Sequence, residues 1–402
     1  MTKRAWHEKL TAEAIIGTED VAPGSPEILF RSDHLEVRRI QAGDGRDQVV
    51  TFESYHDDIG FERSGFGEKF FERVGLTGVH VLTAGNDWYQ YPEIDAALAC
   101  IRDAVAAADR VLAYGSSMGG YAAVRFADAI GATHVLSLSP QYSIDPAIVR
   151  ADRRWWWDQK RIAFLPAHNG TVACAADIVV AYDPTLTLDR LHAELIGRDV
   201  PARLLRLPYG GHPVTTTLNE LGLLQPMALA FCDRGIDPAA VEDDFARLRD
   251  RSAVWLSEYA VRAFSGNPHR AHELAARAIE ISPGSAAMQH QYGMRLHDLG
   301  RYEEAIVAHR SAVAIQRHPI FMLSLSRSLY FAGQYAEALT WVEEALELRS
   351  YDDFYYHSAA RVRLANGDRI GAWRYARTAF RLAKRPRTFW DLIYYGMHAV
   401  FG

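Results

Sequence analysis

The segment Gly115-Ser116-Ser117-Met118-Gly119 fits the pattern G-x-S-x-G, whose serine can act as a nucleophile. The pattern alone is weak, but the apolar run 110–114 precedes it and a helical pattern over 119–130 follows it. A nucleophile in such a turn holds strained backbone, and the flanking glycines leave room for the strand and helix to pass closely. Ser117 is therefore the candidate nucleophile. The alternative is a glycine-rich turn that holds a phosphate at the helix N-terminus.

A serine hydroxyl needs a base to take its proton, and a loop histidine near the end of the first half is the candidate. His212 follows the apolar run 201–207 and comes directly after Gly210-Gly211. Its order and spacing from Ser117 favour a catalytic role. The alternative is an ordinary solvent-exposed loop histidine.

An imidazole that acts as a base needs a carboxylate to orient it and to stabilise its charged form. Asp183 directly follows the apolar run 177–182, and Asp189 comes six residues later. Asp189 resembles the N-cap of the next helix. We predict Asp183 as the acid, with Asp189 as the alternative.

These residues, in the order Ser117, Asp183, His212, make residues 27–232 resemble the α/β-hydrolase family. The resemblance implies an oxyanion hole formed by the backbone N–H of Met118 and, by register, that of Tyr55. It implies catalysis with neither a cofactor nor a metal ion. The chain departs from the family at Glu53-Ser54, where a His-Gly pair is often found.

Aromatic side chains gather in segments that should border the carboxyl edge of the sheet, where ligands of such sheets bind. Trp88, Tyr89 and Tyr91 lie in the segment 85–93, and Trp156 is the middle residue of three consecutive tryptophans. We predict that these four residues contact the substrate. The alternative is that the rings pack the insertion onto the sheet.

The elements that must position these residues follow an alternating pattern of strands and helices. Short apolar runs at 47–56, 78–84, 110–115, 133–139, 177–182 and 201–208 predict strands buried on both faces. Helical patterns lie between most of them, which favours a mostly parallel sheet, and residues 27–40 predict an antiparallel edge pair. We therefore predict an α/β-hydrolase domain over 1–235, with a short cap at about 141–172.

The second half repeats with a period of about 34 residues, the length of a tetratricopeptide unit. Small residues recur in three phases: Gly266, Gly300, Gly333 and Gly367; Ala271, Ala305, Ala338 and Ala372; and Ala278, Ala312, Ala345 and Ala379. Glycine permits a turn between helices, and alanine permits their close approach. Residues 253–384 thus resemble the tetratricopeptide repeat family. The predicted all-α solenoid, residues 236–402, has four repeats and a capping helix.

Composition places the chain among ordinary globular proteins, with 49% hydrophobic and 23% charged residues. Residues 1–238 carry 23 Lys and Arg against 32 Asp and Glu, which argues against nucleic-acid binding there. Three separated cysteines in apolar surroundings predict buried free thiols, and no apolar run is long enough for a membrane span. Residues 1–17 lack the apolar core of a signal peptide. We therefore expect a cytoplasmic protein.

The leading hypothesis is a serine hydrolase that cleaves an ester or related acyl bond of a small-molecule or glycan-linked substrate. The repeats would bind a protein or peptide partner, shape the site, or form a homodimer interface. The same residues would serve an acyltransferase if another acceptor replaced water. A third possibility is a non-catalytic scaffold that recruits partners through its repeats.

Overall fold

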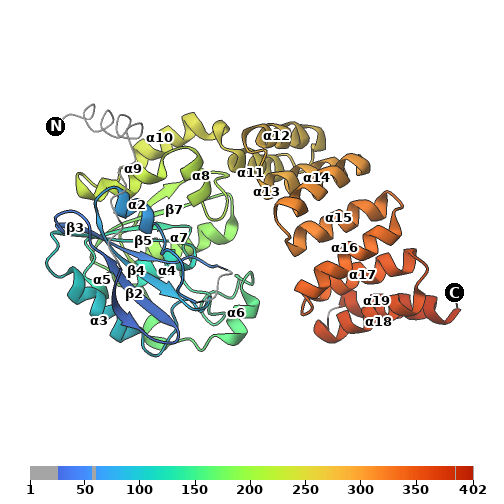
Figure 1. Cartoon of the computed structure of the whole chain (residues 1–402), viewed down its shortest axis with the longest axis horizontal. Coiled ribbons are helices and arrows are strands. Elements are labelled where there is room, and N and C mark those ends of the chain that lie inside the picture. The colour runs from blue at the N-terminus through green and yellow to red at the C-terminus, as the bar shows by residue number, and fades with distance from the viewer. Residues whose placement is uncertain (1–25, 57–59, 385, 402) are drawn as a thin grey trace.

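The computed structural model describes residues 26–56, 60–384 and 386–401. A sheet domain, residues 26–251, and a repeat domain, residues 252–401, lie side by side along the long axis (Figure 1). Residues 1–17, on which the prediction about a signal peptide rests, lie outside the described part of the chain. Within the described residues, no helix has the length and apolar character needed to cross a membrane.

Eight strands form one sheet in the order β1-β2-β4-β3-β5-β6-β7-β8. The strands are β1 (Glu27–Arg31), β2 (Leu35–Ile40), β3 (Asp47–Phe52), β4 (Thr77–Thr83), β5 (Arg110–Ser116), β6 (His134–Leu138), β7 (Asp177–Tyr182) and β8 (Arg203–Arg206). β2 pairs antiparallel with β1 and β4, and all other neighbours are parallel. The predicted strands and the predicted antiparallel edge pair are confirmed.

Nine helices belong to the sheet domain as the structure describes it. They are α2 (Glu68–Arg73), α3 (Ile94–Val105), α4 (Met118–Arg125), α5 (Ala127–Ile130), α6 (Trp156–Arg161), α7 (Thr187–Asp199), α8 (Thr215–Glu220), α9 (Leu224–Leu229) and α10 (Pro238–Leu248). Three short 3₁₀ turns, η1 (Pro166–His168), η2 (Ala230–Cys232) and η3 (Arg249–Arg251), complete it.

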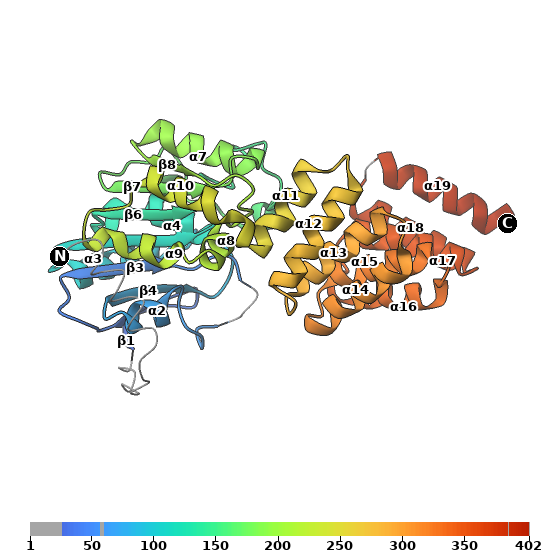
Figure 2. The ribbon, with the colours of Figure 1, turned by 90° about the horizontal axis from the view of Figure 1, so that it is seen from above.

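Helices cover both faces of the sheet because alternate residues of each central strand point to opposite sides. Val111 and Ala113 of β5 pack in the core under α3, α4, α5 and α7, whereas Leu112 and Tyr114 pack under α2, α8, α9 and α10. This alternation explains why the central strands are continuous apolar runs. In Figure 1, α8, α9 and α10 lie above the strands and α3 and α5 lie below them, and Figure 2 views the sheet from the side of α8, α9 and α10.

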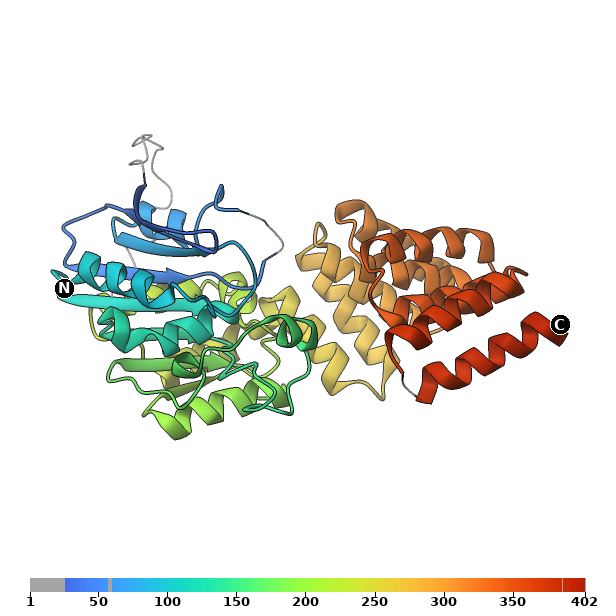
Figure 3. The same ribbon diagram turned by 90° about the horizontal axis from the view of Figure 1, so that it is seen from below.

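The predicted cap, residues 141–172, contains only the short helix α6 and the turn η1. It lies on the side of the sheet domain that faces the repeats (Figure 3). Trp157 of α6 makes an edge contact with Tyr351 of the repeat domain, with ring centroids 5.1 Å apart. The three cysteines are free thiols and are half-buried, whereas the sequence predicted buried ones.

The repeat domain consists of four antiparallel helix pairs and a final helix. The pairs are α11 (Ala253–Ala263) with α12 (Pro268–Ile281), α13 (Ala286–Asp298) with α14 (Tyr302–Ile315), α15 (Pro319–Phe331) with α16 (Tyr335–Leu348), and α17 (Asp353–Ala365) with α18 (Arg369–Leu382). The final helix is α19 (Pro386–Phe401). The all-α solenoid predicted for the second half of the chain is confirmed.

The small residues found in the sequence occupy the crowded positions of this solenoid. Both alanine phases are at most 1% exposed in every repeat, because neighbouring helices approach closely there. Gly300, Gly333 and Gly367 adopt left-handed backbone at the turns between paired helices, a conformation that other residues adopt at a cost. A further close approach occurs at Gly293 of α13, where a Cβ atom would clash with the buried His309 ring.

The two domains share one continuous hydrophobic core. Phe245 of α10 and Leu218 of α8 belong to the cluster under the sheet, and so do Leu256 of α11, Leu274 of α12 and Met288 of α13. The first repeat is therefore packed against the sheet domain rather than tethered to it by a linker.

Replacing Ala338 with leucine tests whether helix proximity explains the alanine phases. Ala338 of α16 has no exposed surface, so the added methyl groups should lower the free energy of unfolding by about 1–3 kcal/mol. Ala336→Leu, at an exposed position of the same helix, is the matched control and should change it by less than about 0.5 kcal/mol. Thermal denaturation followed by circular dichroism measures both. Equal melting temperatures for the two variants would contradict the packing argument.

Candidate active site

Ser117 lies at a sharp turn between the end of β5 and the start of α4. Its backbone has φ 53° and ψ −114°, a conformation that costs free energy in a residue other than glycine. The turn is held because the Ser117 N–H donates to the carbonyl oxygen of Leu138, at the end of the neighbouring strand β6 (2.8 Å). The serine side chain is thus presented at the carboxyl edge of the sheet, where the sequence predicted it.

Three glycines around Ser117 lie where the backbone of the turn and of α4 passes so close to other atoms that a side chain would clash or be crowded. A Cβ atom at Gly115 would clash with the carbonyl of Gly119. One at Gly119 would clash with the carbonyl oxygen of Phe52 in β3, and one at Gly120 would lie 3.0 Å from Ser137 Oγ in β6. The small residues therefore let α4 begin directly over the strands, as the sequence pattern indicated.

A chain of hydrogen bonds runs from Ser117 through His212 to Asp189. Ser117 Oγ lies 3.1 Å from His212 Nε2, and His212 Nδ1 lies 2.7 Å from Asp189 Oδ2. His212 is held in the loop between β8 and α8, and Asp189 is the third residue of α7. Three segments distant in the sequence therefore meet at one edge of the sheet.

The direction of these hydrogen bonds follows from the donor and acceptor capacity of each group. An ionised carboxylate only accepts, so His212 Nδ1 carries the proton that it donates to Asp189. In the neutral imidazole, Nε2 is then the acceptor, and it receives the Ser117 hydroxyl proton. His212 is thus in the tautomer that a general base for Ser117 requires.

Asp189 is ionised in spite of its burial. Burial alone would raise its pKa, but the hydrogen bonds and charges of His212 and Arg154 outweigh that effect and hold the pKa below its usual range. Arg154, from the cap, donates to Asp189 Oδ1 over 2.8 Å. The same guanidinium binds Asp152, which accepts from His192 Nε2 over 2.9 Å. The cap therefore contributes a cation directly to the carboxylate behind His212.

The prediction that Asp183 is the partner of His212 is wrong. Asp183 has no exposed surface, and its two oxygens are occupied by the backbone N–H groups of Thr185, Tyr209 and Gly211 and by Arg262. Asp189 is not the N-cap of α7, because the helix begins at Thr187 and the acid lies inside its first turn. The sequence had offered both aspartates, and only their side-chain contacts separate them.

Gln141 contacts Ser117 and was not among the residues predicted from the sequence. Its Nε2 donates to Ser117 Oγ over 3.2 Å, and its Oε1 accepts from Trp88 Nε1 over 3.1 Å. Gln141 is buried in the segment that follows β6. No local pattern marks one buried amide among the polar residues of a loop, although the position of this loop after β6 was a usable signal.

The two residues predicted to form an oxyanion hole, Met118 and Tyr55, lie in different segments of the sheet domain. Met118 is buried and is the first residue of α4, so its N–H belongs to the unpaired helix N-terminus. Tyr55 follows β3, and its half-exposed ring lies 6.0 Å from Trp88 and 5.4 Å from Trp155, measured between centroids. The role of both N–H groups stays a prediction.

Most of the aromatic residues predicted to contact substrate are buried in the sheet domain. Tyr89 donates from its hydroxyl to the Glu53 carbonyl, and Tyr91 donates to the Gly85 carbonyl, over 3.0 Å in each case. Together with Trp88 they pack the core and do not form the predicted substrate surface. Trp156 is half-exposed, with Lys160 Nζ 4.2 Å from its ring centroid, and its predicted role stays open to test.

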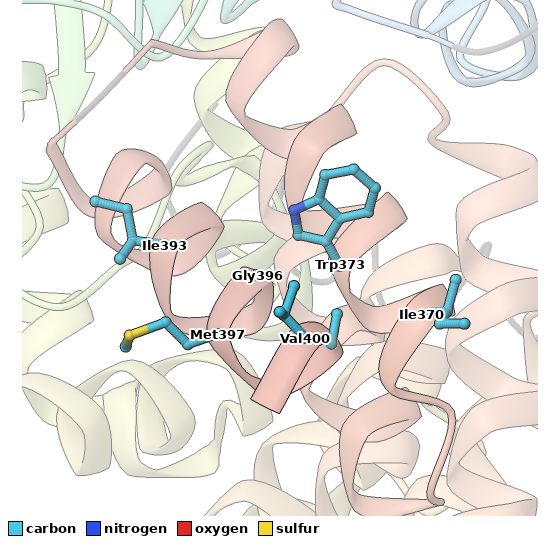
Figure 4. Close-up of a pocket in the computed structure, with 7 residues that line it drawn as sticks. Ile370, Trp373, Ile393, Gly396, Met397 and Val400 are labelled. Atoms are coloured by element: carbon cyan, nitrogen blue, oxygen red, sulfur yellow. The ribbon is translucent and has the colours of Figure 1, made fainter. Parts of the chain in front are cut away.

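Two hollows lie in the repeat domain, away from Ser117. One, of about 540 Å³, is formed by α18 and α19 and has no titratable lining residue (Figure 4); it is lined by Ile370, Trp373, Ile393, Gly396, Met397, Ala399 and Val400. The other, of about 570 Å³, spans α13, α15 and α17. Its basic lining residues are Arg327, Arg349, Arg361 and Arg387.

Comparison with known proteins assigns a repeat family to part of the second half of the chain. A family model described as tetratricopeptide repeat matches residues 237–385. These residues form a tetratricopeptide repeat domain. The comparison with curated proteins finds no match.

The tetratricopeptide repeats also have weak likenesses among solved structures. A MamA double mutant (RS-1) is 16% identical, covers 37% of this chain and 85% of its own, and has a TM-score of 0.34. MamA residues 41 to the end from Desulfovibrio magneticus RS-1 are 15% identical, with coverages of 36% and 90% and a TM-score of 0.32. The Sgt2 repeat domain from Aspergillus fumigatus is 16% identical, with coverages of 28% and 76% and a TM-score of 0.27.

Replacing Asp189 with asparagine tests the hydrogen-bond chain. The amide cannot fix the His212 tautomer as a carboxylate does, so the rate at which a fluorophosphonate labels Ser117 should fall by about 10³- to 10⁴-fold. Glu194→Gln, on the exposed face of the same helix, is the matched control and should label at the wild-type rate. Labelling is followed by intact-protein mass spectrometry. An unchanged rate in Asp189→Asn would show that Asp189 does not support His212.

Proposed function

We propose that the sheet domain is an α/β-hydrolase that cleaves an ester or related acyl bond through Ser117, His212 and Asp189. The observation that carries the proposal is the hydrogen-bond chain, with 3.1 Å from Ser117 Oγ to His212 Nε2 and 2.7 Å from His212 Nδ1 to Asp189 Oδ2. A serine, histidine and buried carboxylate in this geometry form the set that activates a hydroxyl for attack on a carbonyl.

The surrounding fold supports the same proposal. Ser117 has a strained backbone between a central strand and the helix that follows it, which is the setting of a nucleophile elbow. The strand order, with the second strand antiparallel within a parallel sheet, matches that of the α/β-hydrolase fold. The chain order Ser117, Asp189, His212 is also that of the family.

The proposed reaction proceeds in two acyl-transfer steps. Ser117 Oγ attacks the substrate carbonyl carbon while His212 Nε2 takes the hydroxyl proton, and Asp189 stabilises the resulting imidazolium. The oxyanion of the tetrahedral intermediate would accept from the Met118 N–H and from the predicted second donor at Tyr55. His212 then gives its proton to the leaving group, and the acyl-enzyme forms.

A second nucleophile completes the reaction. Water, deprotonated by His212, attacks the acyl-enzyme and releases the acid and free Ser117. If an alcohol or amine takes the place of water, the same residues catalyse acyl transfer, for example to a glycan. The half-exposed aromatic rings of Tyr55 and Trp156 provide flat apolar surfaces suited to a sugar ring or an acyl chain.

An activity screen with the Ser117→Ala variant tests the proposal. The wild-type protein should hydrolyse p-nitrophenyl esters with a defined preference for acyl chain length, or release acetate from acetylated sugars. Ser117→Ala should reduce the rate by about 10⁶-fold, effectively to background, while its circular dichroism spectrum stays unchanged. Thr340→Ala, at an exposed position of the repeat domain remote from the site, is the control. Turnover that persists in Ser117→Ala would refute the proposal.

The repeats suggest a second function, the binding of a protein partner, which would make the chain an interaction scaffold with or without catalysis. The specific observation in its favour is the basic hollow that spans α13, α15 and α17. None of its four arginines, Arg327, Arg349, Arg361 and Arg387, is ion-paired with a carboxylate in the part of the chain that the structure describes. Asp352 is the single carboxylate among the described residues that line it.

An acidic segment fits this hollow best. Nε of Arg361 is buried and has no hydrogen-bond partner among the described residues, and Nη2 of Arg387 lies 2.7 Å from Nε2 of His357. Guanidinium groups in this situation favour carboxylates, with which they form charge-assisted hydrogen bonds. The hollow would therefore select a partner segment rich in Asp or Glu.

Charge reversal in the hollow tests this second function. A fluorescent oligo-glutamate peptide should bind the wild-type protein, and Arg327→Glu/Arg361→Glu should weaken binding by about tenfold or more because attraction becomes repulsion. Arg374→Glu/Arg377→Glu, on the exposed face of α18, is the matched control for net charge. Fluorescence anisotropy measures both. Equal weakening by the two pairs, or equal binding of an oligo-lysine peptide, would contradict a specific acidic-segment site.

A further inference from the structure

The loop that carries His212 lies directly on the first helix of the repeat domain. Trp255 Nε1 of α11 donates to the carbonyl oxygen of Pro208 over 2.9 Å. The Tyr209 ring contacts the Tyr259 ring, with centroids 5.0 Å apart. Gly211 has left-handed backbone, and a Cβ atom there would lie 3.4 Å from the Glu258 side chain. The residue next to His212 thus has α11 as its immediate neighbour.

A buried carboxylate, Asp183, ties this loop to the repeat domain. Its Oδ1 accepts from the backbone N–H of Tyr209, and its Oδ2 accepts from that of Gly211, over 3.0 Å in each case. Arg262, in the last turn of α11, donates to the same Oδ2 over 2.6 Å. Asp183 therefore holds the loop at two points, one of them directly before His212.

The charge of Asp183 makes Arg262 important for this arrangement. Asp183 has no exposed surface, and an ionised carboxylate in that environment needs a cation nearby. Arg262 Nη2 supplies it, while Nε and Nη1 of the same guanidinium are buried without hydrogen-bond partners among the described residues. The guanidinium also lies 5.4 Å from the centroid of the Tyr209 ring, so it contacts the loop itself.

We propose that Arg262 of the repeat domain is a positioning residue for His212, acting through Asp183 and the backbone of the loop 207–212. This inference rests on the proposed function. It adds that the repeat domain is a structural part of the active site, since Arg262 is the cation that contacts the Asp183 carboxylate among the described residues and so keeps Gly211 in place. Arg262 does not touch the reacting atoms, so its effect is on the geometry of His212.

The test compares Arg262→Met and Arg262→Lys in the full-length chain. Arg262→Met should lower kcat and the fluorophosphonate labelling rate by about tenfold or more, with KM within about twofold, because a small displacement of a catalytic base is costly. Arg262→Lys should recover most of the rate, because a single nitrogen of Arg262 makes the contact. Arg270→Met, which removes an exposed arginine of α12, is the matched control and should behave as wild type.

A spectroscopic readout separates positioning from general destabilisation. The downfield proton resonance of His212 Nδ1, hydrogen-bonded to Asp189, should weaken or broaden in Arg262→Met at a temperature where circular dichroism shows the protein folded. If Arg262→Met does not fold, Asp183→Asn/Arg262→Met replaces it, because that variant also removes the buried Asp183 charge that Arg262 pairs; it should show the same loss of kcat. Either folded variant with wild-type kcat and an unchanged His212 resonance would overturn the inference.

The same experiment distinguishes failure of the inference from failure of the proposed function. If the wild-type protein neither labels nor hydrolyses any ester, the proposed hydrolase activity fails. The His212 resonance still decides whether Arg262 positions the imidazole: its loss in a folded Arg262→Met variant supports the inference, and its persistence overturns it.

Discussion

Two buried carboxylates on either side of the His212 loop, Asp189 and Asp183, impose the main constraint on this structure. Each would be unstable as an anion without a cation close by, since transfer of a charge from water to a protein interior is costly. Asp189 receives Arg154 from the cap, and Asp183 receives Arg262 from the repeat domain. The sheet itself supplies neither cation. The two carboxylates beside His212 are therefore charge-paired by residues of the cap and of the first repeat.

The strained backbone of Ser117 depends on equally close packing. Its left-handed conformation persists because the glycines at 115, 119 and 120 allow α4 to begin against the ends of β3 and β6. Any residue with a side chain at Gly115 or Gly119 would meet a backbone carbonyl, which cannot move without displacing a strand. Electrostatic interactions thus determine the positions of His212 and Asp189, whereas steric fit determines the backbone conformation of Ser117.

Local patterns in the sequence were sufficient to predict the elements and to bring two candidate residues together, Ser117 and His212. Apolar runs predicted the strands, and small residues at helical repeats predicted the solenoid, because both depend on spacing along the chain. Ser117 and His212 were found from the elements that flank them. The contacts of Gln141, Arg154 and Arg262 were not predictable, since each joins segments that are distant in the sequence. The burial of Tyr89 and Tyr91 was missed because a loop position does not reveal which side chains turn inward.

There is a physical explanation for why Asp189, and not Asp183 as predicted, contacts His212. Asp189 lies in the first turn of α7, where the helix dipole and the unpaired N–H groups favour a negative charge, and where the helix holds the carboxylate rigidly. Asp183 lies where β7 ends, close enough to the next loop to accept its backbone N–H groups. An acid at that strand end could orient His212 or brace the loop, but its two oxygens cannot do both. Because Asp189 of α7 is the carboxylate that contacts His212, both oxygens of Asp183 are left to bind the loop and Arg262. Asp183 thereby links the loop before His212 to the repeat domain.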